Sequence, residues 1–187
     1  MTSPDSTADP AADYWVFGYG SLMWDPGFAF AAVHPARLAG YHRRFCLYSR
    51  FYRGTPERPG LVLGLDRGGS CRGVVYRVPA AAEATTRDYL WRRELDDYAY
   101  VPKLLPVDYP GGRVRAQAFV VDRSQPQYAG GLDDETAAGL IAAGVGRRGR
   151  NREYLENTLA HLAALGVRDR GLERLAARVR ALDPAAA

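Results

Sequence analysis

The segment Gly18-Tyr19-Gly20-Ser21-Leu22 is the first part of the chain whose residue types and spacing could support chemistry. Two glycines beside a turn let the backbone approach a ligand, and successive N–H groups there can cradle an anion. The segment is not a P-loop, because no Gly-Lys-Ser/Thr follows, and it lacks the third glycine of G-x-G-x-x-G. A nucleotide site is therefore disfavoured. Spacing alone leaves two interpretations open, an anion-binding turn and a simple glycine bend at the end of a strand.

Glu94 is the second candidate for chemistry. On the helix predicted for this stretch, successive residues turn by about 100°, which places Glu94 between Leu90 and Trp91 on an apolar arc. A carboxylate in such surroundings either pairs with a cation or has a raised pKa, and a raised pKa suits a general base. An ion pair with Arg92, Arg93 or a neighbouring element is the alternative that the residues leave open.

Other reactive side chains give weaker signals. The loop 49–55 places two arginines beside two aromatics, which suits a substrate carboxylate but equally an exposed loop packed on its aromatic rings. The three histidines are scattered without ligand spacing, so no metal site is expected. Cys46 lies among apolar residues and Cys71 starts a predicted strand, and we expect each to be a small core residue.

The composition is that of an ordinary globular domain: among 187 residues, 47% are hydrophobic and 25% are charged. We expect one domain over residues 13–183 and a disordered tail over residues 1–12. No run is long enough to span a bilayer, no signal peptide opens the chain, and two cysteines suit a reducing cytoplasm, so we expect a soluble cytoplasmic protein without a membrane partner. No heptad repeat indicates association with a partner chain, and we expect a monomer.

The net charge is +4, and nearly all of the positive charge is arginine, with Lys103 the only lysine. Acidic residues are interleaved with the arginines, and only the segment 147–150 concentrates basic charge. A nucleic-acid groove would need a broader basic stripe with interleaved aromatics, so no nucleic-acid partner is expected. A small anionic substrate held by a few arginines suits this pattern better.

The elements that must position these residues follow from periodicity and turn signals. Strands crowd the first two thirds of the chain and helices the last third, which predicts an α+β domain with a mostly antiparallel, barrel-like sheet and flanking helices. We expect strands at 13–19, 41–47, 61–65, 71–78, 98–106 and 113–121, and helices at 79–95, 134–143, 150–165 and 172–182. The strands 61–65 and 71–78 are predicted to form a hairpin around a turn at 66–70.

Taken together, six segments in order resemble the ChaC-type γ-glutamylcyclotransferases over about residues 15–166. They are Val16-Phe-Gly-Tyr-Gly-Ser-Leu-Met-Trp24, Gly40-Tyr-His-Arg-Arg-Phe45, Arg53-Gly-Thr-Pro-Glu-Arg-Pro-Gly60, Gly73-Val-Val-Tyr76, Arg93-Glu94 and Asn151-Arg-Glu-Tyr-Leu155. The resemblance implies a small β-barrel-like sheet with flanking helices, the γ-glutamylcyclotransferase-like fold. It also implies cleavage of glutathione to 5-oxoproline and Cys-Gly without a metal or organic cofactor.

The resemblance also implies roles for single residues. The turn formed by Tyr19, Gly20, Ser21 and Leu22 is expected to bind the γ-glutamyl moiety through backbone N–H groups. Glu94 is expected to be the general base and to pass its proton to the leaving amine. Tyr154 is expected to line the pocket, and Arg53 with its loop to admit the Cys-Gly end.

Two departures from the family pattern bear on the substrate. Tyr52 stands where relatives commonly have a histidine, and Cys46-Leu47 stands where they have a tryptophan-containing stretch. The alternatives are therefore a cyclotransferase for other γ-glutamyl peptides or amines, and a non-catalytic γ-glutamyl-binding regulator. A regulator would be expected to lack the base, and this chain has Glu94.

Overall fold

The computed structural model of this protein describes residues 13–95 and 99–182. The predicted disordered tail over residues 1–12 lies outside these ranges, as do the first residue of the strand predicted at 98–106 and the last residue of the predicted domain, 183. Among the described residues, no helix combines the length and the apolar character that crossing a membrane requires.

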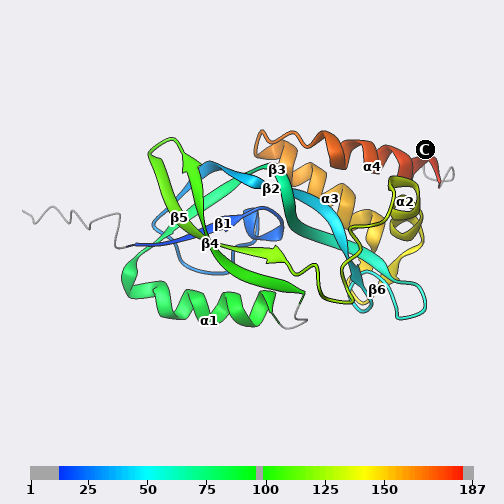
Figure 1. Cartoon of the computed structure of the whole chain (residues 1–187), viewed down its shortest axis with the longest axis horizontal. Coiled ribbons are helices and arrows are strands. Elements are labelled where there is room, and N and C mark those ends of the chain that lie inside the picture. Colours follow the sequence, from blue (N-terminus) through cyan, green and yellow to red (C-terminus); the bar gives the residue numbers. More distant parts are fainter. Residues whose placement is uncertain (1–12, 96–98, 183–187) are drawn as a thin grey trace, which may run out of the picture.

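Five strands close into a barrel in the order β1-β3-β2-β4-β5 (Figure 1). A single parallel contact between Val16 and Gln117 joins β1 to β5, and every other pairing in the barrel is antiparallel. The predicted mostly antiparallel, barrel-like sheet is therefore confirmed. The strands are β1 (Tyr14–Gly18), β2 (Ala32–Ser49), β3 (Gly60–Val78), β4 (Tyr100–Tyr109) and β5 (Gly112–Val121).

The predicted hairpin within residues 61–78 is wrong. β3 runs without a break through residues 66–70 and stays paired with β2 on both sides of them. Gly68 and Gly69, with φ of +105° and +66°, face a register shift beside Gly40, with φ of +81°. Glycines that allow positive φ serve an irregularity in a long strand pair as well as they serve a turn. The true hairpin joins β2 to β3 through the loop 50–59.

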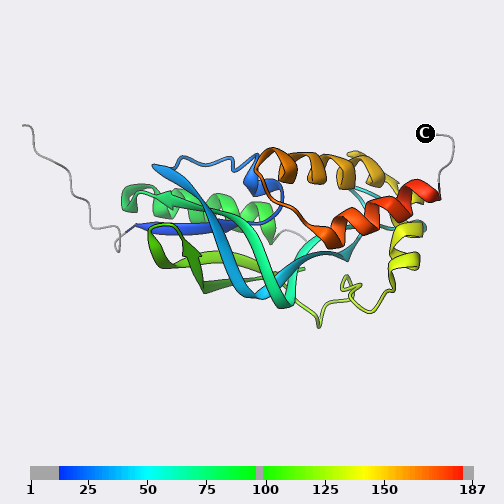
Figure 2. The ribbon, with the colours of Figure 1, turned by 90° about the horizontal axis from the view of Figure 1, so that it is seen from above.

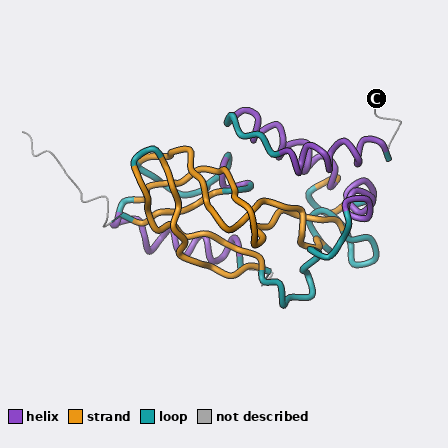
Figure 3. The backbone as a smooth tube through the Cα atoms, turned by 45° about the horizontal axis from the view of Figure 1, so that its top comes forward, coloured by secondary structure: helices purple, strands orange, loops and turns teal. Residues whose placement is uncertain are grey.

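The long β2–β3 pair divides the molecule into two parts. One half of the pair belongs to the barrel, and the other half extends beyond it as a two-stranded ribbon (Figure 3). Helix α1 lies along one side of the barrel, whereas α2, α3 and α4 gather around the ribbon (Figures 1 and 2). The predicted helices are confirmed: α1 (Glu83–Glu94), α2 (Asp134–Ala143), α3 (Asn151–Ala164) and α4 (Arg170–Ala181). Shorter elements are η1 (Ser21–Met23), η2 (Ala80–Ala82), β6 (Val145–Gly146) and β7 (Gly149–Arg150).

The alternation of side chains along β1 explains why this strand is buried on both faces. Trp15 and Phe17 pack into the barrel interior with Leu38, Val75 and others. Tyr14 and Val16 point the opposite way, into the layer that the helices cover. β1 is thus fixed from both sides, and the turn that follows it starts from a rigid element.

Candidate active site

A pocket opens where the end of β1, the end of α1 and the first turn of α3 meet. Its empty volume, which includes open solvent, is about 340 Å³, and it is lined by Tyr19, Gly20, Ser21, Leu22, Leu63, Glu94, Tyr100, Phe119 and Tyr154. The tertiary structure therefore brings together the predicted turn, the predicted base and the predicted pocket tyrosine. These three features are 60 or more residues apart in the sequence.

The turn after β1 continues as the short helix η1. The Met23 N–H donates to the Gly20 carbonyl at 2.8 Å, and the Asp25 N–H donates to the Ser21 carbonyl at 2.8 Å. Gly20 has a negative φ, and a Cβ built there would meet only the Leu63 side chain at 3.5 Å. The glycine therefore matters because it leaves space beside the pocket wall, and positive φ plays no part here.

Arg93 holds this turn against the last turn of α1. Its guanidinium donates to the Ser21 hydroxyl at 2.9 Å, to the Asp25 carbonyl at 2.8 Å and to the Tyr89 hydroxyl at 2.7 Å. Because Glu94 is the next residue, these bonds also fix the carboxylate close to the turn. The sequence pattern presented Arg93 only as a possible ion-pair partner of Glu94, and its bonds to the turn were missed.

Glu94 satisfies both of the interpretations that the sequence left open. Its side chain is 16% exposed, and its nearest cation is the Arg93 Nε, 3.3 Å from Oε1. Burial raises the pKa of Glu94, and the Arg93 charge opposes that rise without cancelling it. The carboxylate is therefore paired and yet remains a better proton acceptor than an exposed glutamate.

Three tyrosines surround this carboxylate. Burial raises the pKa of Tyr154 to about 12 and raises those of Tyr19 and Tyr100 well above the usual value, and the Glu94 charge adds to each shift. All three hydroxyls therefore stay protonated at neutral pH and serve as hydrogen-bond donors. Tyr100 was not singled out from the sequence. It enters the site because its side chain reaches from the start of β4 to β3, where its hydroxyl donates to the Leu63 carbonyl at 2.6 Å.

Tyr154 is positioned by the side chain of Asn151, the first residue of α3. Arg150 occupies the cap position of α3 and makes no side-chain cap bond. The buried Asn151 amide instead accepts from the Leu61 N–H at 2.6 Å and donates to the Leu61 carbonyl at 2.7 Å. An amide can satisfy both groups of a strand residue at once, so α3 is attached to β3 and Tyr154 faces the pocket.

Arg53 lies outside the lining of this inner pocket. Its guanidinium donates to the Arg148 and Arg150 carbonyls and stacks on the Tyr154 ring, 4.9 Å from the ring centre. Burial lowers the pKa of Arg53, which still leaves it a cation at neutral pH. Arg53 therefore supports the pocket tyrosine from behind and joins its loop to the β6–β7 hairpin.

That hairpin and the arginine loop form one composite rim. The N–H groups of Arg147 and Arg148 donate to the Phe51 and Tyr52 carbonyls at 2.8 and 3.0 Å. A Cβ at Gly146 would come within 2.6 Å of the loop backbone, so only glycine permits this approach. Two segments that looked unrelated in the sequence thus act as a single wall.

A wider, open pocket continues from the inner one and shares Ser21, Glu94 and Tyr100 with it. Its empty volume, which includes open solvent, is about 1190 Å³, and it is lined by Ser21, Asp25, Tyr52, Val62, Tyr89, Arg92, Arg93, Glu94, Tyr100 and Arg148. Three arginines against two carboxylates make it electropositive. Arg148 stacks over the Tyr52 ring at 4.8 Å. Tyr52, the departure from the family pattern, therefore supports a cation at the rim.

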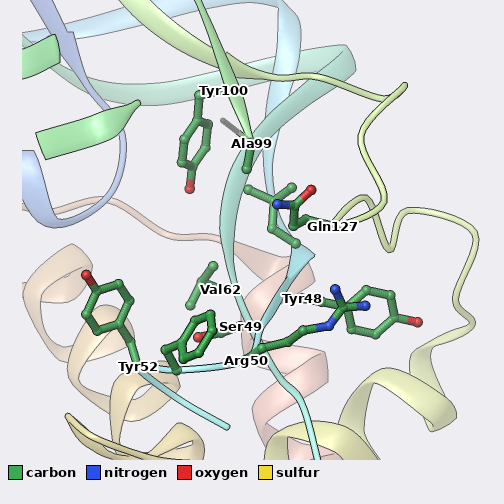
Figure 4. A pocket seen from close by; sticks show the side chains of 10 residues that line it. Tyr48, Ser49, Arg50, Tyr52, Val62, Ala99, Tyr100 and Gln127 are labelled. Carbon is green, nitrogen blue, oxygen red and sulfur yellow. The ribbon is translucent and has the colours of Figure 1, made fainter. Parts of the chain in front are cut away.

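A third cavity lies on the far side of Tyr52 and Tyr100, with an empty volume of about 610 Å³. Figure 4 shows Tyr52 and Tyr100 along one side of it and Tyr48 and Arg50 on the other. Tyr52, Val62 and Tyr100 border both this cavity and the electropositive pocket. These side chains divide a mostly apolar space from the charged one.

Neither cysteine lines the inner or the outer pocket. Cys46 and Cys71 are buried and unpaired, as expected of small core residues, and burial raises their pKa values to about 12 and about 11. Thiols with such values are poor nucleophiles. Within residues 13–95 and 99–182, no group of three or more His, Cys, Asp or Glu side chains is arranged to hold a metal ion.

Comparison with known proteins supports this picture. A family model described as "ChaC-like protein" matches residues 14–182. The "Glutathione-specific gamma-glutamylcyclotransferase" of Escherichia coli (strain K12) is 39% identical over 169 residues, which cover 90% of this chain and 73% of that protein. The human "Glutathione-specific gamma-glutamylcyclotransferase 1" is 37% identical over 157 residues, covering 81% and 70% of the two chains.

Among solved structures, a yeast γ-glutamylcyclotransferase specific to glutathione superposes with a TM-score of 0.81 at 23% identity. The match covers 90% of this chain and 96% of the yeast chain, and it confirms the predicted fold. With one family model spanning the domain and curated relatives of the same family above one-third identity, this chain belongs to the ChaC-like family.

Proposed function

We propose that this chain is a glutathione-specific γ-glutamylcyclotransferase, which converts glutathione to 5-oxoproline and Cys-Gly. The observation that carries the proposal is the buried Glu94 carboxylate of raised pKa beside the Tyr19–Leu22 turn, in a pocket that continues into an electropositive outer pocket. The curated relatives carry the same activity in their names.

The proposed reaction is an internal displacement. The α-amino nitrogen of the γ-glutamyl unit forms a bond to its own γ-carbonyl carbon, and the bond from that carbon to the cysteinyl nitrogen breaks. Two protons leave the α-ammonium, and the departing nitrogen gains two as it becomes the ammonium of Cys-Gly. No water, metal or redox partner is consumed, so the protein must supply a base, a folded-back substrate and donors for the oxyanion.

Glu94 is proposed as the base that takes a proton from the α-ammonium. A pKa raised by burial brings the carboxylate closer to the amine in proton affinity, which favours transfer in both directions. The same carboxylate then delivers a proton to the leaving nitrogen. Arg93 keeps the carboxylate in place without making it a weak base.

The inner pocket is proposed to hold the γ-glutamyl group. Backbone N–H groups of the turn formed by Tyr19, Gly20, Ser21 and Leu22 bind its charged end, and protonated tyrosine hydroxyls supply further donors. Tyr154 lines the same pocket as Glu94, with Arg53 stacked on its ring. The outer pocket then accepts the Cys-Gly part, whose terminal carboxylate suits its arginines.

The proposed site is complete within one chain and uses no organic cofactor or metal. We therefore keep the prediction of a monomer, which size-exclusion chromatography with light scattering tests. A cytoplasmic location follows from the proposed substrate and from two unpaired cysteines. Fractionation of the host cell tests it.

The experiment is incubation of the purified chain with reduced glutathione, with 5-oxoproline and Cys-Gly followed by mass spectrometry. Glu94→Gln is run beside it, with Glu83→Gln as the matched control. Glu83 lies on the same helix but pairs with Arg87 in a solvent-exposed position. Products from the wild type and the control, with none from Glu94→Gln, would support the proposal.

Other results would point elsewhere. Products from Glu94→Gln at the wild-type rate would remove that residue from the mechanism. Turnover of γ-glutamylamines or other γ-glutamyl peptides in preference to glutathione would select the related cyclotransferase. Binding of γ-glutamyl compounds without any product would select the regulator.

A further inference from the structure

Arg43 is a buried cation on β2 that contacts the turn of the proposed site from behind. Its side chain is 1% exposed. Nε donates to the Tyr19 carbonyl, Nη2 donates to the Arg72 carbonyl at 2.7 Å, and Nη1 donates to the Asp169 carboxylate at 3.0 Å. The Met23 sulfur lies 3.5 Å from Nη2. All three guanidinium nitrogens thus have a partner, and the Nε bond goes to the turn itself.

The bond to the Tyr19 carbonyl has a directional consequence. In a planar trans peptide, the carbonyl of one residue and the N–H of the next point in opposite directions. Arg43 does not line the inner pocket and borders a separate one with Arg72 and Asp169, so the Tyr19 oxygen that it binds points away from the inner pocket and the Gly20 N–H points to the opposite side. Gly20 itself lines the inner pocket.

We infer that Arg43 is a positioning residue that turns the Gly20 N–H toward the γ-glutamyl group of the substrate. This inference rests on the proposed function and adds a residue to it. A charged donor on the carbonyl also polarises the peptide, which makes the N–H on its other end a stronger hydrogen-bond donor. Arg43 acts on the substrate only through this peptide.

The cost of burying Arg43 argues against a purely structural role. A buried ion pair is often no more stabilising than apolar side chains of the same volume, since desolvation offsets the attraction. The neighbouring residue shows the contrast. Arg44 also binds carbonyls, those of Gly130 and Leu132 at 2.8 and 3.0 Å, but these belong to a loop away from the pocket. Arg44 is therefore a matched control from the same strand.

Glutathione binding without turnover separates the two roles. In a Glu94→Gln background, isothermal titration with glutathione is compared for Arg43→Met, Arg43→Lys and Arg44→Met. Loss of one well-directed donor to a charged group should weaken binding about 10-fold to 100-fold for Arg43→Met. Arg43→Lys should recover part of this loss, and Arg44→Met should bind like its parent while its melting temperature falls.

A measurement on the unmodified turn covers the case in which the Arg43 variants do not fold. In ¹⁵N-labelled Glu94→Gln protein, the Gly20 amide resonance should shift on addition of glutathione, more than the resonances of the loop that Arg44 binds. A Gly20 amide that does not move would overturn the inference. So would a folded Arg43 variant that binds as tightly as its parent, or an Arg44 variant that loses as much binding.

Failure of the proposed function has a different signature. In that case the wild type makes no product and the Glu94→Gln protein binds no glutathione, whatever stands at position 43. If the wild type turns over glutathione and the Arg43 variants bind it as tightly as their Glu94→Gln parent, only the positioning role is overturned.

Discussion

Two buried carboxylates in this molecule have pKa values shifted in opposite directions. Asp66, on β3, is 1% exposed and accepts from Arg123 at 2.8 Å, from the Tyr128 hydroxyl at 2.9 Å and from the Arg67 N–H at 2.8 Å. Burial alone would raise the pKa of Asp66, but these hydrogen bonds outweigh it and hold the pKa below its usual value. Glu94 is also largely buried, yet its one charged neighbour at 3.3 Å leaves the pKa raised.

The comparison teaches that burial alone does not create a base. What separates the two sites is the number of donors aimed at the carboxylate after it has lost water. Asp66 has three and remains a stable anion that joins β3 to the segment after β5. Glu94 keeps proton affinity because its surroundings donate little to it, and it faces a pocket instead of a closed network.

The largest expected effect comes from removing the proposed proton acceptor. Glu94→Gln keeps the volume and the contact with Arg93 but cannot take a proton, so kcat for glutathione should fall about 100-fold to 10,000-fold. Steady-state kinetics check this, with Glu83→Gln as the control. A Glu94→Gln enzyme within a few-fold of the wild type would end the assignment of Glu94 as base.

A complementary experiment replaces the Asp66 carboxylate with an amide. Asp66→Asn leaves the donors of Arg123 and Tyr128 poorly matched, and the free energy of unfolding should fall by about 1–3 kcal/mol while kcat at 25 °C is retained. Thermal or urea unfolding measures it. Asp108→Asn, which removes an exposed pair with Arg113, should cost less than about 1 kcal/mol. Equal losses in both variants would show that the Asp66 network contributes nothing special.

The pH dependence of activity sharpens the comparison further. With Glu94 as the proposed base, kcat/KM should decline as pH falls through the Glu94 pKa, and this acid limb should lie above the range of an ordinary glutamate. Arg93 lowers the Glu94 pKa, so Arg93→Gln should move the midpoint of the limb to higher pH, whatever it does to the maximal rate. A midpoint that stays in place, or moves to lower pH, would contradict the electrostatic role of Arg93.

The smallest expected effect is a difference in sign between two stability profiles. The folded pKa of Asp66 is lowered, so its stabilising contribution is present above its unfolded pKa of about 3.9 and is lost as pH falls through the folded value. The folded pKa of Glu94 is raised, so the folded state loses stability as pH rises from its unfolded value through the folded one. The free energy of unfolding is measured across pH for the wild type, Asp66→Asn and Glu94→Gln. The difference between the wild type and each variant gives the slope due to that carboxyl, and slopes of the same sign would refute the contrast.

Much of the fold was predictable because its signals are local. The helix 134–143 matches α2 in both bounds, and the strands around 13–19 and 113–121 are found within two residues of their predicted limits. Alternation and turn residues act over a few positions, so a single sequence contains them. The prediction of a turn at 66–70 was wrong for the same reason, because a glycine pair has the same local signature in a bulge as in a hairpin.

The candidate site divides in the same way. The residue types for the chemistry, a glycine-bounded turn after a strand and a carboxylate on an apolar helix arc, were readable from the chain. Tyr100, Arg43 and the bonds of Arg93 to the turn were not, because they depend on which strand lies beside which. A one-dimensional pattern gives no signal for a tyrosine that meets a leucine carbonyl 37 residues away.

The sequence by itself determined the residue types: a glycine-bounded turn after a strand, a glutamate on an apolar helix arc and the alternating strands of a barrel. Tertiary structure alone decided that Glu94 is buried with one partner while Asp66 has three, and that the rim combines the arginine loop with the β6–β7 hairpin. The physical reason is that side-chain type is a property of a residue, whereas solvation and donor count are properties of its neighbours in space.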